Sequence, residues 1–214
     1  MKTAKINIIN QSVSFEQIPD FDTLMAITRA GKTCYMAKNL TSREKIENFI
    51  KGLIKKGHMS VIEHGWASIR IVCSRGLSHE LVRHRIASFS QSSTRYVNFQ
   101  KKGYEVIEPL WITRKLYKSQ YQEIYKKWKN SITQSFQTYS ALLDYGIPPE
   151  YARGVLTLDL KTELVMTANL REWRYIIQLR GTKFAHPQMQ VLTKDILKLF
   201  MESEVKCIFK DIKL

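Results

Sequence analysis

The longest periodic stretch of the sequence lies between residues 113 and 145 and constrains the fold most. Apolar and aromatic side chains recur there at near-helical spacing, at Leu116, Tyr117, Tyr121, Ile124, Tyr125, Trp128, Ile132, Phe136, Tyr139 and Leu143. This spacing places them on one face of a helix, and Gly146 supplies a stop. The pattern predicts one long helix whose aromatic stripe packs against a core rather than stacking on a ligand.

Shorter patterns predict strands elsewhere in the chain. Residues 66–73 alternate apolar and polar side chains, which indicates a half-buried strand. Residues 4–9 and 104–107 read as short strands, and the β-branched residues within 155–168 favour a strand over a helix. Residues 85–99 are polar and serine-rich, which predicts a loop.

Two capping patterns mark helix starts. Thr41 with Glu44 opens a helix that Gly57 ends, and Asn169 with Glu172 opens a second helix. The second of these helices is expected to span 169–180, and further helices are expected over 20–30, 77–84, just after Pro148-Pro149 and over 187–209. The sequence contains neither a repeat nor a linker, so we expect a single α+β domain over residues 1–214.

The charge balance favours anionic partners. Thirty-four Lys and Arg against 19 Asp and Glu give a net charge of +15, which attracts nucleic acid, nucleotides, phosphorylated cofactors or anionic lipid. No run approaches the roughly 20 apolar residues of a membrane helix, and the N-terminus lacks a secretory pattern. Cys34, Cys73 and Cys207 are widely spaced, which indicates reduced thiols in a cytoplasm rather than a metal site or disulfides.

The densest constellation is Arg83-His84-Arg85. Three consecutive basic side chains cannot share one face of a strand or helix, so the cluster can serve more than one anionic group. Hydroxyl and amide side chains follow between Ser88 and Arg95, and these are a suitable cradle for phosphate oxygens. The residues alone leave three readings open: a nucleotide or cofactor site, an RNA-binding loop, and a plain surface loop.

These residues are similar to those of a known family, the flavin-dependent thymidylate synthases. That family is marked by Arg-His-Arg, seven residues, a Ser, and an Arg two positions further on, as in Arg83-His84-Arg85, Ser93 and Arg95 here. The similarity continues in order through GHMSVIEH (57–64), EYARGVLTLDL (150–160), NLREWRYIIQLR (169–180) and AHPQM (185–189).

The resemblance implies an enzyme that methylates dUMP reductively to dTMP. Methylenetetrahydrofolate would donate the one-carbon unit, and NADPH would supply reducing equivalents through FAD. It also implies an α+β fold with an antiparallel sheet flanked by helices, assembled as a homotetramer with active sites where subunits meet. Neither nucleic acid, a membrane nor a metal ion is expected as a partner.

The resemblance assigns residues to each ligand. Arg180 would stabilise negative charge developing on the uracil ring, which makes it the expected catalytic residue, and Arg153 would join the nucleotide site from another subunit. The expected dUMP-binding residues are Glu80, Leu81, Val82, Arg83, Gln91, Ser92, Ser93, Thr94, Arg95, Arg153 and Arg180. The expected FAD-binding residues are His58, Ser60, Arg83, His84, Arg85, Gln91, Asn169, Leu170, Arg171 and Tyr175.

Some positions depart from the family pattern. Glu80 stands where the family usually has Gln, and Gln91 where some members have Glu, so the two could exchange roles. Tyr175 replaces an Asn seen in some relatives. No cysteine has the basic or helix-start setting of a reactive thiolate, so we expect catalysis without a cysteine nucleophile. The expected arginines are spread over about a hundred residues, which suits convergence on one nucleotide better than a broad RNA-binding face.

Overall fold

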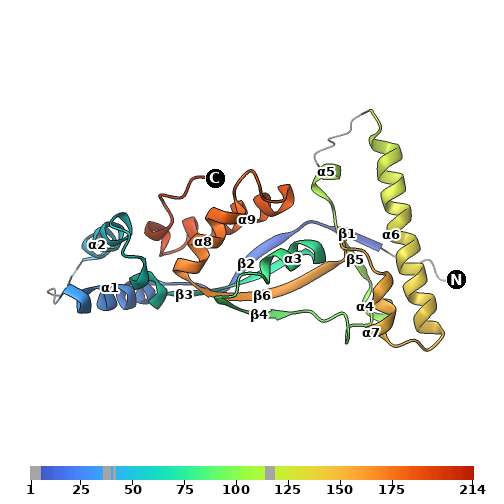
Figure 1. Cartoon of the computed structure of the whole chain (residues 1–214), viewed down its shortest axis with the longest axis horizontal. Coiled ribbons are helices and arrows are strands. Elements are labelled where there is room, and N and C mark those ends of the chain that lie inside the picture. Colours follow the sequence, from blue (N-terminus) through green and yellow to red (C-terminus); the bar gives the residue numbers. More distant parts are fainter. Residues whose placement is uncertain (1–5, 36–39, 41, 114–118) are drawn as a thin grey trace. The chain divides into compact units, whose positions relative to one another are not determined.

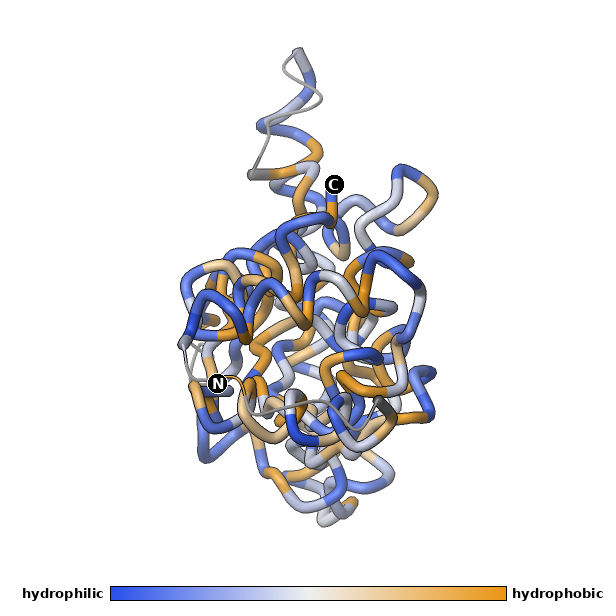
Figure 2. The backbone as a smooth tube through the Cα atoms, turned by 90° about the vertical axis from the view of Figure 1, so that its left-hand side faces the viewer, coloured by the Kyte–Doolittle hydropathy of each residue, from blue (hydrophilic) through white to orange (hydrophobic). Residues whose placement is uncertain are grey.

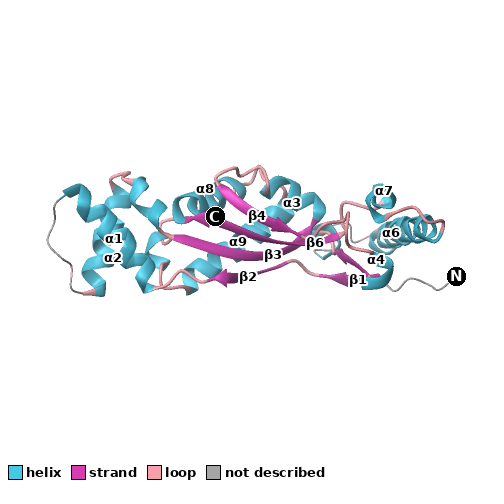
Figure 3. Ribbon diagram, turned by 90° about the horizontal axis from the view of Figure 1, so that it is seen from below, coloured by secondary structure: helices cyan, strands magenta, loops and turns pink. Residues whose placement is uncertain are grey.

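The larger sheet of the described residues is four-stranded and antiparallel with the strand order β2-β3-β6-β4, and helices flank it (Figure 3). Its strands are β2 (Ser12–Gln17), β3 (Trp66–Ser74), β6 (Lys161–Asn169) and β4 (Ala87–Gln91). The structure, a computed structural model, describes residues 6–35, 40, 42–113 and 119–214 (Figure 1). The α+β class with a flanked antiparallel sheet is thereby confirmed.

The remaining elements are one further strand pair and a set of helices. They comprise β1 (Ile6–Ile9), α1 (Phe21–Tyr35), α2 (Arg43–Lys55), η1 (Met59–His64), α3 (Arg75–Leu81), α4 (Phe99–Lys102), β5 (Tyr104–Ile107), α5 (Leu110–Thr113), α6 (Tyr121–Asp144), α7 (Pro149–Ala152), η2 (Arg153–Val155), α8 (Leu170–Arg180), α9 (Pro187–Glu202) and η3 (Lys206–Ile208), where η marks a 3₁₀-helix. β1 and β5 pair in parallel, with Ile6 opposite Tyr104 and Ile9 opposite Ile107.

Contacts divide the chain into two compact units. Unit 1 contains Met1–Gln11, Val72–Val82 and Gln91–Leu164, and unit 2 contains Ser12–Ile71, Arg83–Ser90 and Val165–Leu214. Because each unit is assembled from three separated segments, its residues meet only in the folded chain. The expectation of a single domain over residues 1–214 stays a prediction.

Unit 1 has its core where α6 meets the parallel pair. Ile132, Phe136 and Tyr139 of α6 are buried there, and the Phe136 ring stacks on Tyr104 of β5 with centroids 4.2 Å apart. The aromatic stripe of α6 therefore packs against a core, as predicted. Gly146 has a φ of 84° and follows the end of α6, a left-handed conformation that glycine adopts without strain.

Unit 2 is centred on α8 and α9. Trp173 and Phe200 are fully buried, and the Phe200 ring stacks on Phe209 at 4.1 Å. The indole N–H of Trp173 donates to the carbonyl of Ala67 at 3.0 Å, which ties α8 to β3. In the same unit α1 and α2 lie side by side (Figure 1).

Several sequence expectations need correction. Residues 87–91 form β4 rather than loop, because pairing in the sheet satisfies the backbone of a segment whose composition favours a turn. The helix expected over 113–145 is observed as α6, which begins at Tyr121 after a turn at residues 119 and 120 and ends at Asp144. Leu116 and Tyr117 lie outside the described residues, as do residues 4 and 5 of the first predicted strand. The last helix ends at Glu202 and not at residue 209.

Ser42 caps α2, and its side chain accepts a hydrogen bond from the Lys45 N–H; Thr41 lies outside the described residues. Figure 2 shows hydrophobic and hydrophilic residues interleaved along the backbone. In the described part of the chain no helix is both long and apolar enough to cross a membrane.

Candidate functional site

In unit 1 the serine-rich segment after β4 is held in one conformation by main-chain bonds. The Ser92 N–H donates to the carbonyl of Glu163 at 2.9 Å, which anchors the segment beside β6. Further along, the Val97 N–H donates to the Ser93 carbonyl at 3.0 Å and the Arg95 N–H donates to Ser93 Oγ at 3.2 Å. These bonds form a turn that gathers the hydroxyls of Ser92, Ser93 and Thr94 within three consecutive residues.

Arg153 reaches this turn from η2. Its Nη1 donates to Thr94 Oγ1 at 3.0 Å, and its Nε donates to the carbonyl of Glu150 at 3.1 Å. The second bond fixes the guanidinium plane, and the first places it against the hydroxyl turn. Arg153 therefore meets the Ser93–Arg95 run within a single chain. The expectation that Arg153 contributes to the nucleotide site of another subunit stays a prediction.

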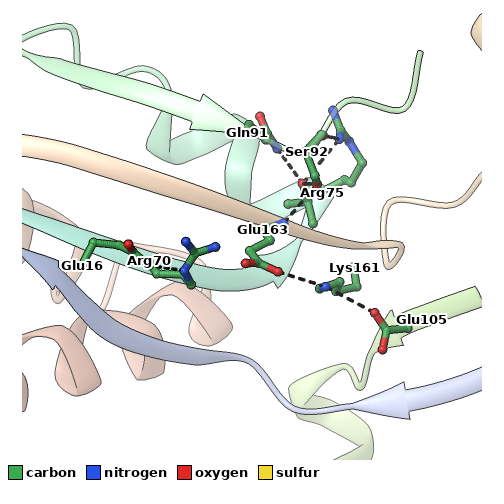
Figure 4. Close-up of polar contacts among 9 residues, drawn as sticks. Glu16, Arg70, Arg75, Gln91, Ser92, Glu105, Lys161 and Glu163 are labelled. Atoms are coloured by element: carbon green, nitrogen blue, oxygen red, sulfur yellow. Dashed lines mark hydrogen bonds and ion pairs between the residues drawn. The ribbon is translucent and has the colours of Figure 1, made fainter. Parts of the chain in front are cut away.

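Arg75 joins the same region and was absent from the residues predicted for the site. It is the first residue of α3, directly after β3, and its Nη1 donates to the Ser92 carbonyl at 3.3 Å and to Thr162 Oγ1 at 3.5 Å (Figure 4). Burial and the positive charge of Arg153 both lower the pKa of Arg75. The sequence feature that could have indicated Arg75 is its position as a charged residue just after the alternating strand.

Buried hydroxyls connect this arginine to Gln91. Gln91 Nε2 donates to Ser78 Oγ at 2.9 Å and to Thr162 Oγ1 at 3.0 Å, while Ser92 Oγ lies 3.1 Å from Thr162 Oγ1. Ser78 and Thr162 are fully buried. Within the described residues Glu80 is not a hydrogen-bond partner of Gln91. The two residues that depart from the family pattern are therefore not paired with each other in this structure.

The positive charge of the turn is not neutralised inside unit 1. Within the described residues, no Asp or Glu forms an ion pair with Arg75, Arg95 or Arg153, although Lys161 nearby is paired with both Glu105 and Glu163, at 3.3 and 3.2 Å (Figure 4). Arg75 and Arg153 lie close enough for their charges to interact, and they repel one another unless an anion lies between them. The arrangement is therefore suited to an oxyanion with several acceptor oxygens.

In unit 2 the three side chains of the Arg83-His84-Arg85 cluster differ in exposure, as expected for three consecutive residues that cannot share one face. The side chains of Arg83 and Arg85 are exposed, whereas His84 is buried between them. Leu81 is buried and Val82 exposed at the preceding turn, in unit 1.

Both ring nitrogens of His84 have protein partners. Arg180 Nε donates to His84 Nε2 at 3.1 Å, and His84 Nδ1 lies 3.3 Å from Glu172 Oε1. A neutral imidazole carries one N–H, so a ring that accepts at Nε2 has its proton on Nδ1, facing the carboxylate. Burial and the charge of Arg180 lower the pKa of His84 to about 4, which agrees with this neutral form, and burial raises the pKa of Glu172.

The start of α8 lies in the same unit. Asn169 caps the helix, with its Oδ1 accepting from the Glu172 N–H at 2.8 Å, which confirms the predicted cap. Leu170 is fully buried and its N–H donates to the Gly65 carbonyl, while Arg171 is exposed and paired with Glu63 at 2.6 Å.

The other residues expected at the flavin also belong to unit 2, except Gln91. His58 and Ser60 are exposed at η1. The Tyr175 ring packs edge-on against the His84 ring with centroids 6.0 Å apart. Every ligand contact assigned in the sequence analysis stays a prediction.

Two of the cysteines are protected from ionisation. Cys73 lies in β3 and Cys207 in η3, both are buried, and burial raises their pKa values to about 12 and about 11. Cys34 in α1 is exposed. A thiolate nucleophile is therefore disfavoured at Cys73 and Cys207.

Comparison with known proteins matches this chain to one family. The family model described as thymidylate synthase complementing protein matches residues 18–203. A flavin-dependent thymidylate synthase of Geobacter sulfurreducens is 32% identical over 197 residues, covering 89% of this chain and 82% of the relative. Relatives of that name from Pyrococcus furiosus and Thermococcus onnurineus are 31% and 33% identical, covering 81% and 79% of this chain and 70% and 68% of the relatives. The chain therefore belongs to the flavin-dependent thymidylate synthase family.

Proposed function

We propose that the protein converts dUMP to dTMP, with methylenetetrahydrofolate as one-carbon donor and NADPH as reductant through bound FAD. The observation that carries this proposal is the unneutralised arginine set of unit 1 beside three hydroxyl side chains. A nucleoside monophosphate supplies the dianionic phosphate that such a set lacks. Family membership supplies the reaction class.

The phosphate of dUMP is held in this proposal by the turn of unit 1. Arg153 and Arg95 contribute guanidinium donors, and Ser92, Ser93 and Thr94 contribute hydroxyls. Arg75 joins them because it lies close enough to Arg153 for their charges to interact. Each charge-assisted hydrogen bond to phosphate contributes about 1.5–3 kcal/mol when well aligned.

The residues of unit 2 fit a flavin dinucleotide in their chemistry. A dinucleotide carries a pyrophosphate and an aromatic ring system, and the exposed Arg83, Arg85 and Arg171 offer donors matched to the former. The exposed face of Tyr175 offers packing for the latter. Bound FAD supplies hydride transfer, and the protein's own residues bind and orient the reactants around it.

Arg180 is the residue proposed to act on the pyrimidine. A guanidinium beside the uracil carbonyl stabilises negative charge that develops on the ring when its carbon attacks the one-carbon unit. No cysteine is needed to activate the ring in this scheme, and the raised pKa values of Cys73 and Cys207 support that reading.

We also propose that the enzyme works as a homotetramer. Three tyrosines of unit 1, Tyr96, Tyr145 and Tyr151, expose most of their surface. Large exposed aromatic side chains are enriched on surfaces that a partner covers.

The test is a product assay for dTMP in which FAD, NADPH and methylenetetrahydrofolate are omitted in turn. The complete mixture should form dTMP, and each omission should prevent it once endogenous flavin is removed. Arg153→Ala should raise the KM for dUMP about tenfold or more, while Lys127→Ala, which removes an exposed lysine paired with Glu123, should not. A protein that binds flavin yet makes no dTMP from the complete mixture contradicts the proposal.

A further inference from the structure

His84 lies in a chain of contacts that starts at one end of α8 and ends at the other. Glu172 stands in the first turn of the helix and Arg180 is its last residue, and the imidazole of His84 bridges them. The side chains of His84 and Glu172 are only 4% and 10% exposed, so water competes little for either contact. The Glu172 carboxylate therefore contacts the His84 imidazole, and the imidazole contacts the Arg180 guanidinium.

The direction of the hydrogen bond between Arg180 and His84 is determined. Arginine is always a donor, so His84 Nε2 must accept from Arg180 Nε. The imidazole proton is then on Nδ1, and Glu172 Oε1 lies 3.3 Å from that nitrogen. The nearby carboxylate favours this tautomer of His84, and the tautomer in turn offers Nε2 to Arg180 as an acceptor.

Holding an arginine by Nε has a specific consequence. The guanidinium is planar, so a bond at Nε sets the plane in which the two terminal NH₂ groups lie. Arg180 is only partly buried, and the bond at Nε restricts a side chain that has four rotatable bonds.

We propose that His84 and Glu172 are positioning residues that orient the Arg180 guanidinium for its action on the pyrimidine. This inference rests on the proposed function, and it assigns to His84 a role toward Arg180 rather than toward the flavin. Other groups near the ring are compatible with it, since Tyr175 packs against its edge and the adjacent Arg83 and Arg85 are directed to solvent.

The first test is removal of the carboxylate in the full-length, flavin-loaded enzyme. Glu172→Ala should lower kcat for dTMP formation about tenfold to a hundredfold. The KM for dUMP and the flavin content per chain should each change by less than about threefold, because an orienting contact acts mainly in the transition state. Glu172→Gln keeps an acceptor oxygen for Nδ1–H and should recover most of the kcat.

A matched control separates orientation from helix stability. Arg174, also on α8, is buried and forms two hydrogen bonds with Asp211, at 2.6 and 2.7 Å. Asp211→Asn weakens that pair, so it should lower the melting temperature without lowering kcat per bound flavin. Equal losses of kcat in Glu172→Ala and Asp211→Asn would mean that Glu172 is merely structural and would overturn the inference.

The effect of Glu172→Ala on kcat in an Arg180 variant distinguishes a positioning role of Glu172 from a merely structural one. Lysine has no Nε–H at this place, so Arg180→Lys removes the group that His84 orients. In that background Glu172→Ala should change the residual kcat by less than about twofold, because the contributions of coupled residues are not additive. An undiminished further loss contradicts the proposed route through Arg180.

A measurement on the unmodified enzyme remains decisive if Glu172→Ala does not fold. Histidine-selective ¹⁵N spectra near pH 7.5 should show His84, assigned through His84→Gln, as the Nδ1–H tautomer. An Nε2–H tautomer or a charged ring overturns the inference while dTMP formation continues. Failure of the wild-type enzyme to form dTMP, by contrast, rejects the proposed function on which the inference rests.

Discussion

Lowering the pH should destabilise this protein through His84 before most carboxylates titrate. An unfolded histidine has a pKa of about 6.5, whereas that of His84 in the folded chain is about 4. The unfolded state therefore binds more protons between these two values, so the free energy of unfolding falls as the pH falls through this window. The contribution is fully present above about pH 6.5 and is lost near pH 4.

The magnitude follows from the difference between the two pKa values. Lowering the pH from 7.5 to 4.5 removes about 2.5 kcal/mol, because this range crosses about two pH units of the window between the two pKa values and each unit is worth about 1.4 kcal/mol. A domain has about 5–15 kcal/mol of stability in total, so the loss is large enough to measure.

Other groups titrate in or near this window and must be cancelled. Burial raises the pKa values of Glu172, Asp159 and Asp195, and those groups change stability in the opposite sense, destabilising the fold as the pH rises. Asp211 has its pKa lowered by Arg174, so its contribution is lost only at more acidic pH. The difference in unfolding free energy between two variants that share these groups therefore reports the contribution of His84 alone.

The assay is urea unfolding at fixed protein and flavin concentrations, from pH 7.5 to pH 4.5. It compares Glu172→Gln with the double variant His84→Gln/Glu172→Gln, so that Glu172 does not titrate in either. The stability difference between them should shift by about 2–3 kcal/mol over this range, with Glu172→Gln losing more as the pH falls. A difference that stays constant refutes the assignment of a buried neutral His84.

Three further outcomes are expected from the geometry. Arg75→Ala should raise the KM for dUMP about tenfold or more with a smaller change in kcat, measured beside Lys127→Ala, and an unchanged KM would remove Arg75 from the phosphate site. Gly65→Ala should cost about 1–3 kcal/mol in urea unfolding because three side-chain ends lie within 2.9 Å of the added carbon, whereas Gly52→Ala, with no atom within 4 Å in α2, should gain about 0.5–1 kcal/mol. Cys73→Ala should keep its kcat for dTMP formation, and loss of turnover in a folded, flavin-loaded variant would reopen a thiol mechanism.

Local sequence determined the elements whose stabilising groups lie close together in the chain. The Asn169–Glu172 cap of α8 and the alternation of β3 use residues a few positions apart, so they could be recognised without knowledge of the fold. The same holds for the stop at Gly146, where only the local backbone conformation matters. Family resemblance added the reaction class, because the spacing of Arg83-His84-Arg85, Ser93 and Arg95 is itself a local pattern.

Tertiary structure decided the features whose partners are distant in sequence. Residues 87–91 became a strand because a sheet supplied hydrogen-bond partners that their own composition could not predict. Arg75 joined the hydroxyl turn through Ser92 and Thr162, which lie 17 and 87 residues away. His84 and Arg180 are 96 residues apart, and only folding buries the imidazole, fixes its proton on Nδ1 and presents its other nitrogen to the guanidinium. Burial and hydrogen-bond direction depend on those distant partners, which is why the sequence identified the basic residues of the site but not the contacts that orient them.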